Sequence, residues 1–146
     1  MNKNTEACIF CKIVQKNMSA HIINETDHTL TFLDIYPSTK GHALVIPKTH
    51  VEKIEDASEL VLSTLLAGVQ KSISILQDAL SPEAFSIGWN NGQCAGQVVP
   101  HLHVHVLPRW ESDGGGSMHT IIQKKCDSHP EDILHLFTHP LVCQKD

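Results

Sequence analysis

Three histidines at alternate positions, His101, His103 and His105, are the residues whose type and spacing best suit chemistry. In a β-strand, alternate side chains point to opposite faces, so segment 101–109 predicts a strand with three imidazoles on one open face. Neutral imidazole is a common zinc ligand. With a pKa near ~6.5 it is also largely neutral at pH 7 and able to attack phosphorus. The spacing therefore indicates either metal ligation or nucleophilic catalysis.

The loop before this strand, residues 90–97, offers groups that could bind a phosphate. Asn90 and Gln97 carry side-chain amides, and Gly92 and Gly96 expose unhindered backbone N–H groups. Asn-Gly loops mostly serve as turns, so this loop indicates a phosphate site only together with the strand that follows it.

Two cysteines near the N-terminus, Cys8 and Cys11, have a spacing that lets both thiolates reach one zinc ion at ~2.3 Å. Two further ligands must then come from elsewhere. Two buried cysteines or a redox pair are the alternatives, although a redox pair ordinarily follows a strand and none is expected before Cys8. The other three cysteines, Cys94, Cys126 and Cys143, have no comparable partners and are interpreted as incidental thiols.

The elements that must position these groups follow from hydrophobic periodicity. Strands are expected at 29–36, 42–46 and 84–89 in addition to 101–109, and a short helix at 8–15. A long helix is expected at about 57–80, beginning at a capping box of Asp56 and Glu59 and ending at Ser81-Pro82. Its expected apolar face comprises Leu62, Leu66, Val69, Ile73, Leu76 and Leu80. Together these elements predict an α+β domain in which one long helix covers an antiparallel sheet.

Composition narrows the class of protein. The chain has 146 residues, 41% of them hydrophobic and 18% charged, which is typical of one folded domain. A net charge of −5 argues against a non-specific nucleic-acid binder. No secretory signal or bilayer-length apolar run is recognised, so the expectation is a cytoplasmic protein with no membrane partner and no disulfide framework.

The run His101-Leu102-His103-Val104-His105-Val106-Leu107 resembles the pattern that defines the histidine triad (HIT) superfamily, in which histidines alternate with hydrophobic residues. Segments 32–50 and 88–109 are similar to the nucleotide-binding strands and loop of that family. The resemblance covers roughly residues 8–109, and the N-terminal CxxC resembles the bacterial-type hydrolases. It implies a HIT-like domain over 1–110, with residues 111–146 as a C-terminal extension that packs on the same domain.

The resemblance also implies roles for individual residues. His103 corresponds to the nucleophile that is transiently nucleotidylated, and His105 to the histidine that contacts the phosphate and leaving group. Each step uses protein groups, so no catalytic cofactor is implied. Asp34 matches the residue that holds the ribose hydroxyls, Ile35 flanks the base, and His42 is a further active-site histidine. The phosphate-loop positions are Asn90, Gly96, Gln97 and Val98, the last of which is often serine in the phosphoramidase branch.

The implied metal site is a structural zinc held by Cys8, Cys11, His50 and His101. The family implies a homodimer and a purine nucleotide substrate: a phosphoramidate, an aminoacyl-adenylate or a dinucleoside polyphosphate. Two alternatives remain at this point. One is a metalloenzyme that uses the three triad histidines as ligands of a catalytic metal, and the other is a nucleotide-binding regulatory protein with negligible turnover.

Overall fold

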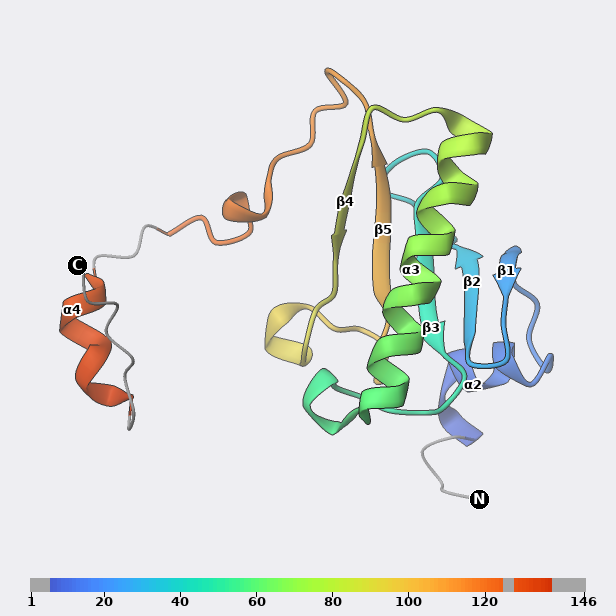
Figure 1. The fold of residues 1–146 in the computed structure, drawn as a ribbon, viewed down its shortest axis with the longest axis horizontal. Helices are drawn as coiled ribbons and strands as arrows, with labels where there is room; N and C mark the ends of the chain where they lie inside the picture. The colour runs from blue at the N-terminus through green and yellow to red at the C-terminus, as the bar shows by residue number, and fades with distance from the viewer. Residues whose placement is uncertain (1–5, 125–127, 138–146) are drawn as a thin grey trace, which may run out of the picture. The chain divides into compact units, whose positions relative to one another are not determined.

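The computed structural model describes residues 6–124 and 128–137, and it divides into two compact units, Met1–Gly115 and Gly116–Asp146. The first unit is built on a five-stranded sheet in the order β1-β2-β3-β5-β4, in which every pair of neighbours is antiparallel (Figure 1). The strands are β1 (Ile22–Glu25), β2 (Thr29–Leu33), β3 (Ala43–Pro47), β4 (Ala84–Gly88) and β5 (Val104–Arg109). The predicted α+β class with an antiparallel sheet is confirmed.

The long helix α3 (Glu59–Leu80) packs on one face of this sheet. Leu65, Val69 and Leu76 of the helix form one buried cluster with Val104 and Val106 of β5. By length and composition alone α3 could cross a membrane, but this packing is that of the core helix of a globular domain. Because side chains alternate between the two faces along β5, its apolar residues pack against α3, as the sequence predicts.

The start of α3 differs from expectation. The cap is Ser58, whose hydroxyl accepts a hydrogen bond from Val61 N–H at 3.3 Å. Asp56 instead lies in the 3₁₀ turn η1 (Ile54–Asp56), so the predicted capping box at Asp56 is wrong. The helix ends as expected, because Ser81 adopts a left-handed conformation with φ 48°.

The buried face of α3 also differs in part from expectation. Leu66 is 58% exposed, whereas the small residues Gly68 and Ser72 are buried. A Cβ at Gly68 would lie 2.9 Å from Thr29 Oγ1, and Ser72 Oγ lies 2.9 Å from Thr31 Oγ1. The helix backbone approaches β2 closely at these small residues, and this turns Leu66 away from the sheet.

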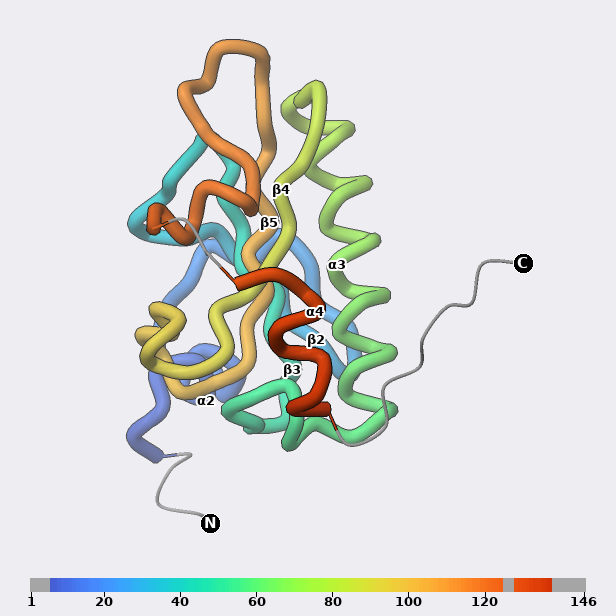
Figure 2. Tube along the Cα trace, turned by 90° about the vertical axis from the view of Figure 1, so that its left-hand side faces the viewer, coloured from blue at the N-terminus to red at the C-terminus, as the bar shows by residue number. Residues whose placement is uncertain are grey.

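The opposite face of the sheet is partly covered by the short helix α2 (Ile9–Val14), as Figures 1 and 2 show from two directions. Phe10, Cys11 and Ile13 form a second buried cluster with residues of β2 and β3, namely Leu30, Phe32, Leu44 and Ile46. Helix α2 thus covers part of the sheet face that carries the triad.

Three strand boundaries correct the sequence-based expectation. Strand β1 was not predicted; it is a four-residue edge strand with an irregular register against β2. Strand β2 ends at Leu33, because Asp34 turns the chain by accepting Tyr36 N–H. Strand β5 begins at Val104 rather than at 101, because Leu102 N–H donates instead to Val51 O at 2.7 Å.

The second unit contains the 3₁₀ turn η3 (Met118–Thr120), the short helix α4 (Pro130–Ile133) and the turn η4 (Leu134–Leu136). His129 and Asp132 cap α4 reciprocally. The predicted packing of residues 111–146 on the first domain stays a prediction. Cys126 and Cys143 lie outside the described residues.

Candidate active site and metal centre

The ring of His103 is held by the chain that precedes it. Its Nδ1 lies 2.6 Å from the main-chain oxygen of His101, and the side chain is buried. A carbonyl oxygen only accepts hydrogen bonds, so Nδ1 carries the proton of the neutral ring. The lone pair is then on Nε2, so this nitrogen is the atom of the ring that is able to act as a nucleophile.

The ring of His105 has the opposite tautomer, fixed by a chain of three groups. The N–H of Ser38 donates to His42 Nδ1 at 3.2 Å, so the proton of His42 resides on Nε2. That Nε2 lies 2.9 Å from His105 Nδ1, which therefore accepts. His105 is left with its proton on Nε2. Ser38 was not singled out in the sequence, because its contribution is a backbone group that only the turn after β2 brings to His42.

These two rings lie next to each other, with centroids 5.0 Å apart and planes inclined at 71°. One presents a lone pair and the other an N–H donor. A nucleophile beside a proton donor is the arrangement required to displace a leaving group from phosphorus.

Burial keeps both rings neutral. It lowers the pKa of His105 to about 4, with further lowering from the neighbouring His103 and His42. It also lowers the pKa of His103, against the opposing effect of the hydrogen bond to His101 O. At neutral pH the ring of His103 is therefore unprotonated.

Phe10 closes the site from the N-terminal side. Its ring packs edge-on against His103 with centroids 5.3 Å apart, and against His101 at 5.8 Å. His101 is completely buried. The expectation of three imidazoles on an open face is therefore wrong, since α2 covers the first two. The one hint in the sequence was an aromatic residue between the cysteines of the CxxC motif.

The segment after β2 brings Asp34 to His42. Asp34 Oδ2 lies 3.6 Å from His42 Nε2, while Oδ1 accepts Tyr36 N–H at 2.8 Å. The next residue, Ile35, is an exposed apolar side chain. The structure thus brings Asp34, His42, His103 and His105 together from three separate segments, as the predicted site requires.

The phosphate-loop positions lie between β4 and β5, where Gly92 and Gly96 have φ values of 94° and 96°. Asn90 lies beside Gly96, 3.6 Å from where a Cβ would be. Val98 is 90% exposed, and among the described residues its N–H has no acceptor, unlike those of its loop neighbours Ala95, Gly96 and Gln97. The backbone donor at position 98 is therefore available to a ligand.

The other predicted loop residue, Gln97, is buried and bonded within the chain. Its Oε1 accepts Gly92 N–H at 2.7 Å, and its Nε2 donates to Glu52 O and Val99 O. Its predicted direct contact with phosphate stays a prediction.

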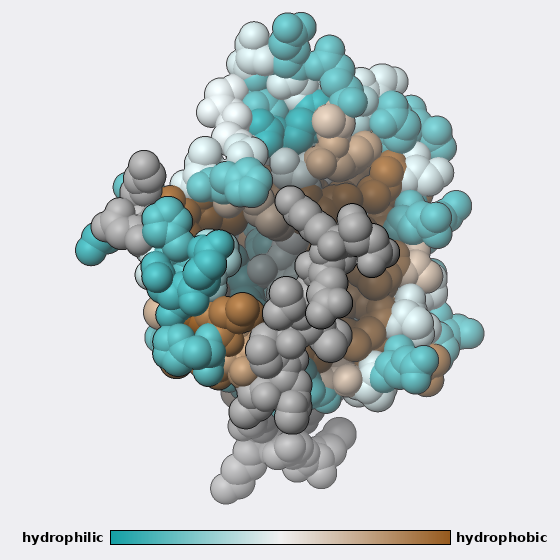
Figure 3. All heavy atoms as spheres, turned by 60° about the vertical axis from the view of Figure 1, so that its left-hand side comes forward, coloured by the Kyte–Doolittle hydropathy of each residue, from teal (hydrophilic) through white to brown (hydrophobic). Residues whose placement is uncertain are grey.

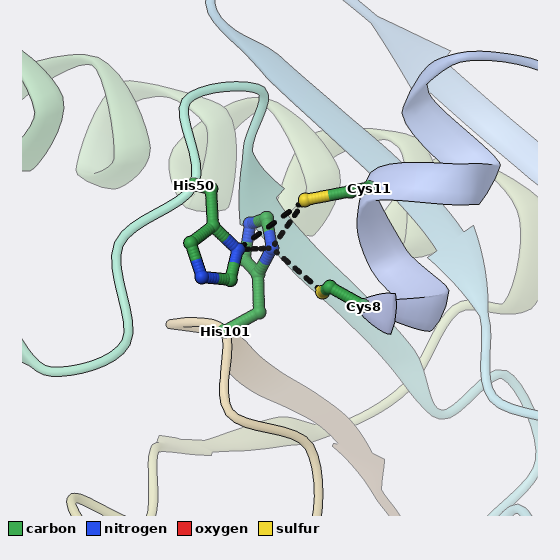
Figure 4. Close-up of side chains that lie close together, drawn as sticks. All are labelled: Cys8, Cys11, His50 and His101. Atoms are coloured by element: carbon green, nitrogen blue, oxygen red, sulfur yellow. Dashed lines mark hydrogen bonds between the residues drawn. The ribbon is translucent and has the colours of Figure 1, made fainter. Parts of the chain in front are cut away.

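Four side chains with metal-binding atoms converge from three segments (Figure 4). They are Cys8 and Cys11 at the start of α2, His50 after β3 and His101 before β5. Cys11 Sγ lies 3.3 Å from His50 Nδ1 and 3.7 Å from His101 Nδ1, Cys8 Sγ lies 3.5 Å from His101 Nδ1, and the two Nδ1 atoms are 3.3 Å apart. A tetrahedral zinc ion with bonds of 2.1–2.3 Å requires ligand separations of about 3.4 to 3.8 Å. These four residues, called the cage below, therefore fit such an ion.

The tautomer of His101 supports the same assignment. Its Nε2 donates to Pro47 O at 2.9 Å, which leaves the lone pair on the Nδ1 that faces the thiols. Burial and the neighbouring Cys8 raise the pKa of the Cys11 thiol to about 12, and a bound cation supplies the charge that lets a thiol ionise. Because both nitrogens of His101 are used here, His101 has none left for a metal shared with His103 and His105.

A second group, Asp34, His42 and His105, also lies close enough to hold a cation. The hydrogen bond from Ser38 puts a proton on the His42 nitrogen that would have to bind it. The hydrogen bonds of this group therefore favour a chain of proton donors and acceptors over a metal site.

Comparisons with known proteins find a matching family and several similar chains. The HIT domain family matches residues 15–112. Protein hit of Bacillus subtilis is 37% identical over 133 residues, covering 90% of each chain. Adenosine 5'-monophosphoramidase hnt1 of Schizosaccharomyces pombe is 40% identical over 109 residues, covering 75% of this chain and 79% of the relative. The crystal structure of a HIT family member from Bacillus subtilis superposes with a TM-score of 0.77 at 37% identity, covering 89% of this chain and 92% of that chain.

Proposed function

The chain belongs to the histidine triad (HIT) family, and from this membership we propose that it is a nucleotide hydrolase whose nucleophile is His103. The observation that carries the proposal is the pair of opposite tautomers: His103 presents a lone pair beside the N–H of His105, with ring centroids 5.0 Å apart. A binding protein needs donors for phosphate but has no use for a buried nucleophile in this orientation.

The first step forms a covalent intermediate. His103 Nε2 attacks the α-phosphorus, and the bond from phosphorus to the leaving group breaks while His105 Nε2–H donates a hydrogen bond to that group, which takes up a proton from solvent as it leaves. The nucleotidylated ring is an imidazolium, and the carbonyl of His101 stabilises its Nδ1–H. In the second step a water oxygen bonds to phosphorus and its proton passes to solvent, and the phosphorus–nitrogen bond breaks to release the nucleoside monophosphate and the neutral ring of His103.

The proposed substrates are purine nucleotides that carry a leaving group on the α-phosphate. Asp34 would hold the ribose hydroxyls, Ile35 would flank the base, and Asn90, Gly96, Gln97 and Val98 would form the phosphate loop. A nucleoside phosphoramidate is the favoured substrate because one relative is named an adenosine 5'-monophosphoramidase. Aminoacyl-adenylates and dinucleoside polyphosphates share the same reacting phosphorus. Val98 supplies a backbone donor but no hydroxyl.

The cage is proposed to hold a structural zinc ion. The ion would tie α2 to His50 and to His101, whose carbonyl fixes the tautomer of His103. It would supply folding free energy rather than reaction chemistry. No catalytic cofactor is part of the proposal.

A homodimer is proposed on the side that carries the edge strand β4. Apolar side chains are exposed there on β4 and α3, and hydrophobic surface is visible on this side in Figure 3. The residues are Leu60, Leu66, Ile87 and Trp89, and Leu66 and Trp89 also line an apolar hollow with Ile54, Leu62, Leu65, Leu102 and Val104. Unpaired strand edges and apolar patches are commonly covered by a partner. A cytoplasmic location, with neither nucleic acid nor membrane as partner, completes the proposal.

The test is direct detection of the intermediate. The purified protein is mixed with adenosine 5'-phosphoramidate, quenched in mildly alkaline solution and weighed by intact mass spectrometry, with His103→Ala as the matched control. An adenylyl adduct on the native protein and none on the variant is expected. Tight binding of AMP with neither adduct nor turnover would instead favour the regulatory protein, and turnover lost on chelation would favour the metalloenzyme.

A further inference from the structure

The side chain of Gln97 is placed to act as a brace, that is, to hold its loop in one position. Only 8% of its surface is exposed, although it lies in a loop whose neighbouring residues are exposed. Its amide makes three hydrogen bonds, from Gly92 N–H at 2.7 Å and to the carbonyl oxygens of Glu52 and Val99 at 2.9 and 3.1 Å. Both of its N–H groups are thereby used, and its oxygen is engaged by the loop itself.

The segment to which Gln97 is tied serves the rest of the site. His50 is a cage residue, Val51 O accepts Leu102 N–H at 2.7 Å, and Glu52 O accepts the amide of Gln97. Three consecutive residues therefore contact the cage, the stretch between His101 and His103, and the phosphate loop. A second tie lies nearby, since Asn91 accepts Ile54 N–H at 3.0 Å and donates to Glu55 at 2.7 Å.

We propose that Gln97 is a positioning residue that fixes the phosphate loop to segment 50–52 and does not itself contact the substrate. The proposal rests on the proposed function. The loop contains two glycines with positive φ, so without a brace its backbone has many accessible conformations. Gln97 removes that freedom in the free protein and so presents the N–H of Val98 in a fixed place.

The position of the brace predicts how substitutions divide between binding and chemistry. A preorganised loop contacts phosphate in the ground state and in the transition state alike, so loosening it raises KM and leaves kcat nearly unchanged. A side chain that touched the reacting phosphate would instead change kcat. Substitution of Gln97 should also affect the cage, because segment 50–52 contains the cage residue His50.

The experiment compares Gln97→Met and Gln97→Glu with the matched control Gln93→Met, an exposed glutamine in the same loop. Methionine keeps the shape and removes all three hydrogen bonds, whereas glutamate retains the acceptor for Gly92 but loses both donors. AMP affinity is measured by calorimetry, KM and kcat with adenosine 5'-phosphoramidate, and amide hydrogen exchange at Gly92 by NMR.

The expected result is a Kd for AMP raised about tenfold in both Gln97 variants, with KM following Kd and kcat within about twofold. Gly92 exchange should accelerate in Gln97→Met and stay slow in Gln97→Glu. Gln93→Met should match the native protein in every measurement. In the unmutated protein, slow exchange at Gly92 is required in any case, which keeps the proposal testable if a variant fails to fold.

Two failures are distinguishable. A native protein that neither binds AMP nor turns over the phosphoramidate overturns the proposed function. A native protein that does both, with Gln97→Met equal to it in Kd, or with kcat reduced and KM unchanged, overturns the role of Gln97 alone.

Discussion

The main-chain oxygen of His101 accepts the Nδ1 proton of His103 at 2.6 Å, while the His101 side chain faces Cys8 and Cys11. One residue therefore belongs to the cage through its ring and to the active site through its backbone. The orientation of the nucleophile thus depends on how firmly residue 101 is held.

Replacement of the proton donor should impair chemistry more than binding. His105→Asn keeps an acceptor for His42 Nε2 but loses the N–H that faces the leaving group. Because loss of one preorganised donor to developing charge costs about 10²- to 10³-fold, kcat should fall by that range. Steady-state kinetics checks this, with AMP affinity as the control. A fall in affinity of the same size as the fall in kcat would contradict the assigned role.

Acidification should destabilise the fold through the same histidine. The pKa of His105 is lowered to about 4 in the folded protein and is about 6.5 when the chain is unfolded. The unfolded state therefore binds more protons between these values, so the free energy of unfolding rises with pH there and is lost as pH falls from 6.5 toward 4. Thermal denaturation between pH 7 and pH 5 measures this slope.

The matched comparison for that slope is His105→Asn. Asparagine does not titrate, so the variant should lose less stability than the native protein over the same pH interval. Equal pH slopes in the two proteins would mean that His105 titrates alike in the folded and unfolded states.

Removal of a cage thiol should release zinc and loosen the N-terminal helix. Cys11→Ser is expected to abolish the single zinc ion per chain, measured by elemental analysis, and to lower the melting temperature, because α2 then loses its tie to His50 and His101. Cys94→Ser is the control, since Cys94 is exposed in the loop and lies outside the cage. Zinc retained at full occupancy in Cys11→Ser would disprove the ligand assignment.

The close approach of α3 to the sheet should tolerate no larger residue at Gly68. A Cβ there would lie 2.9 Å from Thr29 Oγ1 and 3.2 Å from Val45 Cγ1, and both of these residues are buried. Overpacking a core typically costs about 1–3 kcal/mol, so Gly68→Val should lower the free energy of denaturant unfolding by that amount. The neighbouring Ala67→Val adds the same side chain at an exposed position and should change it far less. Equal losses in the two variants would contradict crowding at Gly68, and helix propensity would not explain them, because valine ranks above glycine and below alanine in a helix.

Local patterns predicted the parts of the molecule that depend on neighbours in sequence. Helix α3 and strand β3 are set by periodicity, and the triad spacing identified His103 and His105 before any tertiary contact was known. The boundaries were less accurate, because Leu102 and Asp34 leave the sheet for hydrogen bonds to the backbone of other segments or to a local turn.

The contacts that escaped prediction join distant segments. Phe10 lies more than 90 positions before His103, and Gln97 reaches Glu52 across 45 positions. Neither side chain differs from an ordinary core aromatic or loop amide when seen in the sequence. The small residues Gly68 and Ser72 were missed for another reason, since hydrophobic periodicity does not register residues that are buried because they are small.

The cage also affects when helix α2 becomes fixed during synthesis of the chain. Cys8 meets His101 across 93 positions, so helix α2 is synthesised well before the segment that leads into β5. At synthesis rates of roughly 5 to 20 residues per second, that wait lasts on the order of 5 to 20 seconds. During this interval the nascent chain carries two unprotected thiols, and Phe10 lacks the rings of His101 and His103 that pack against it. Helix α2 thus gains its full set of contacts only after residues 101–103 have been synthesised.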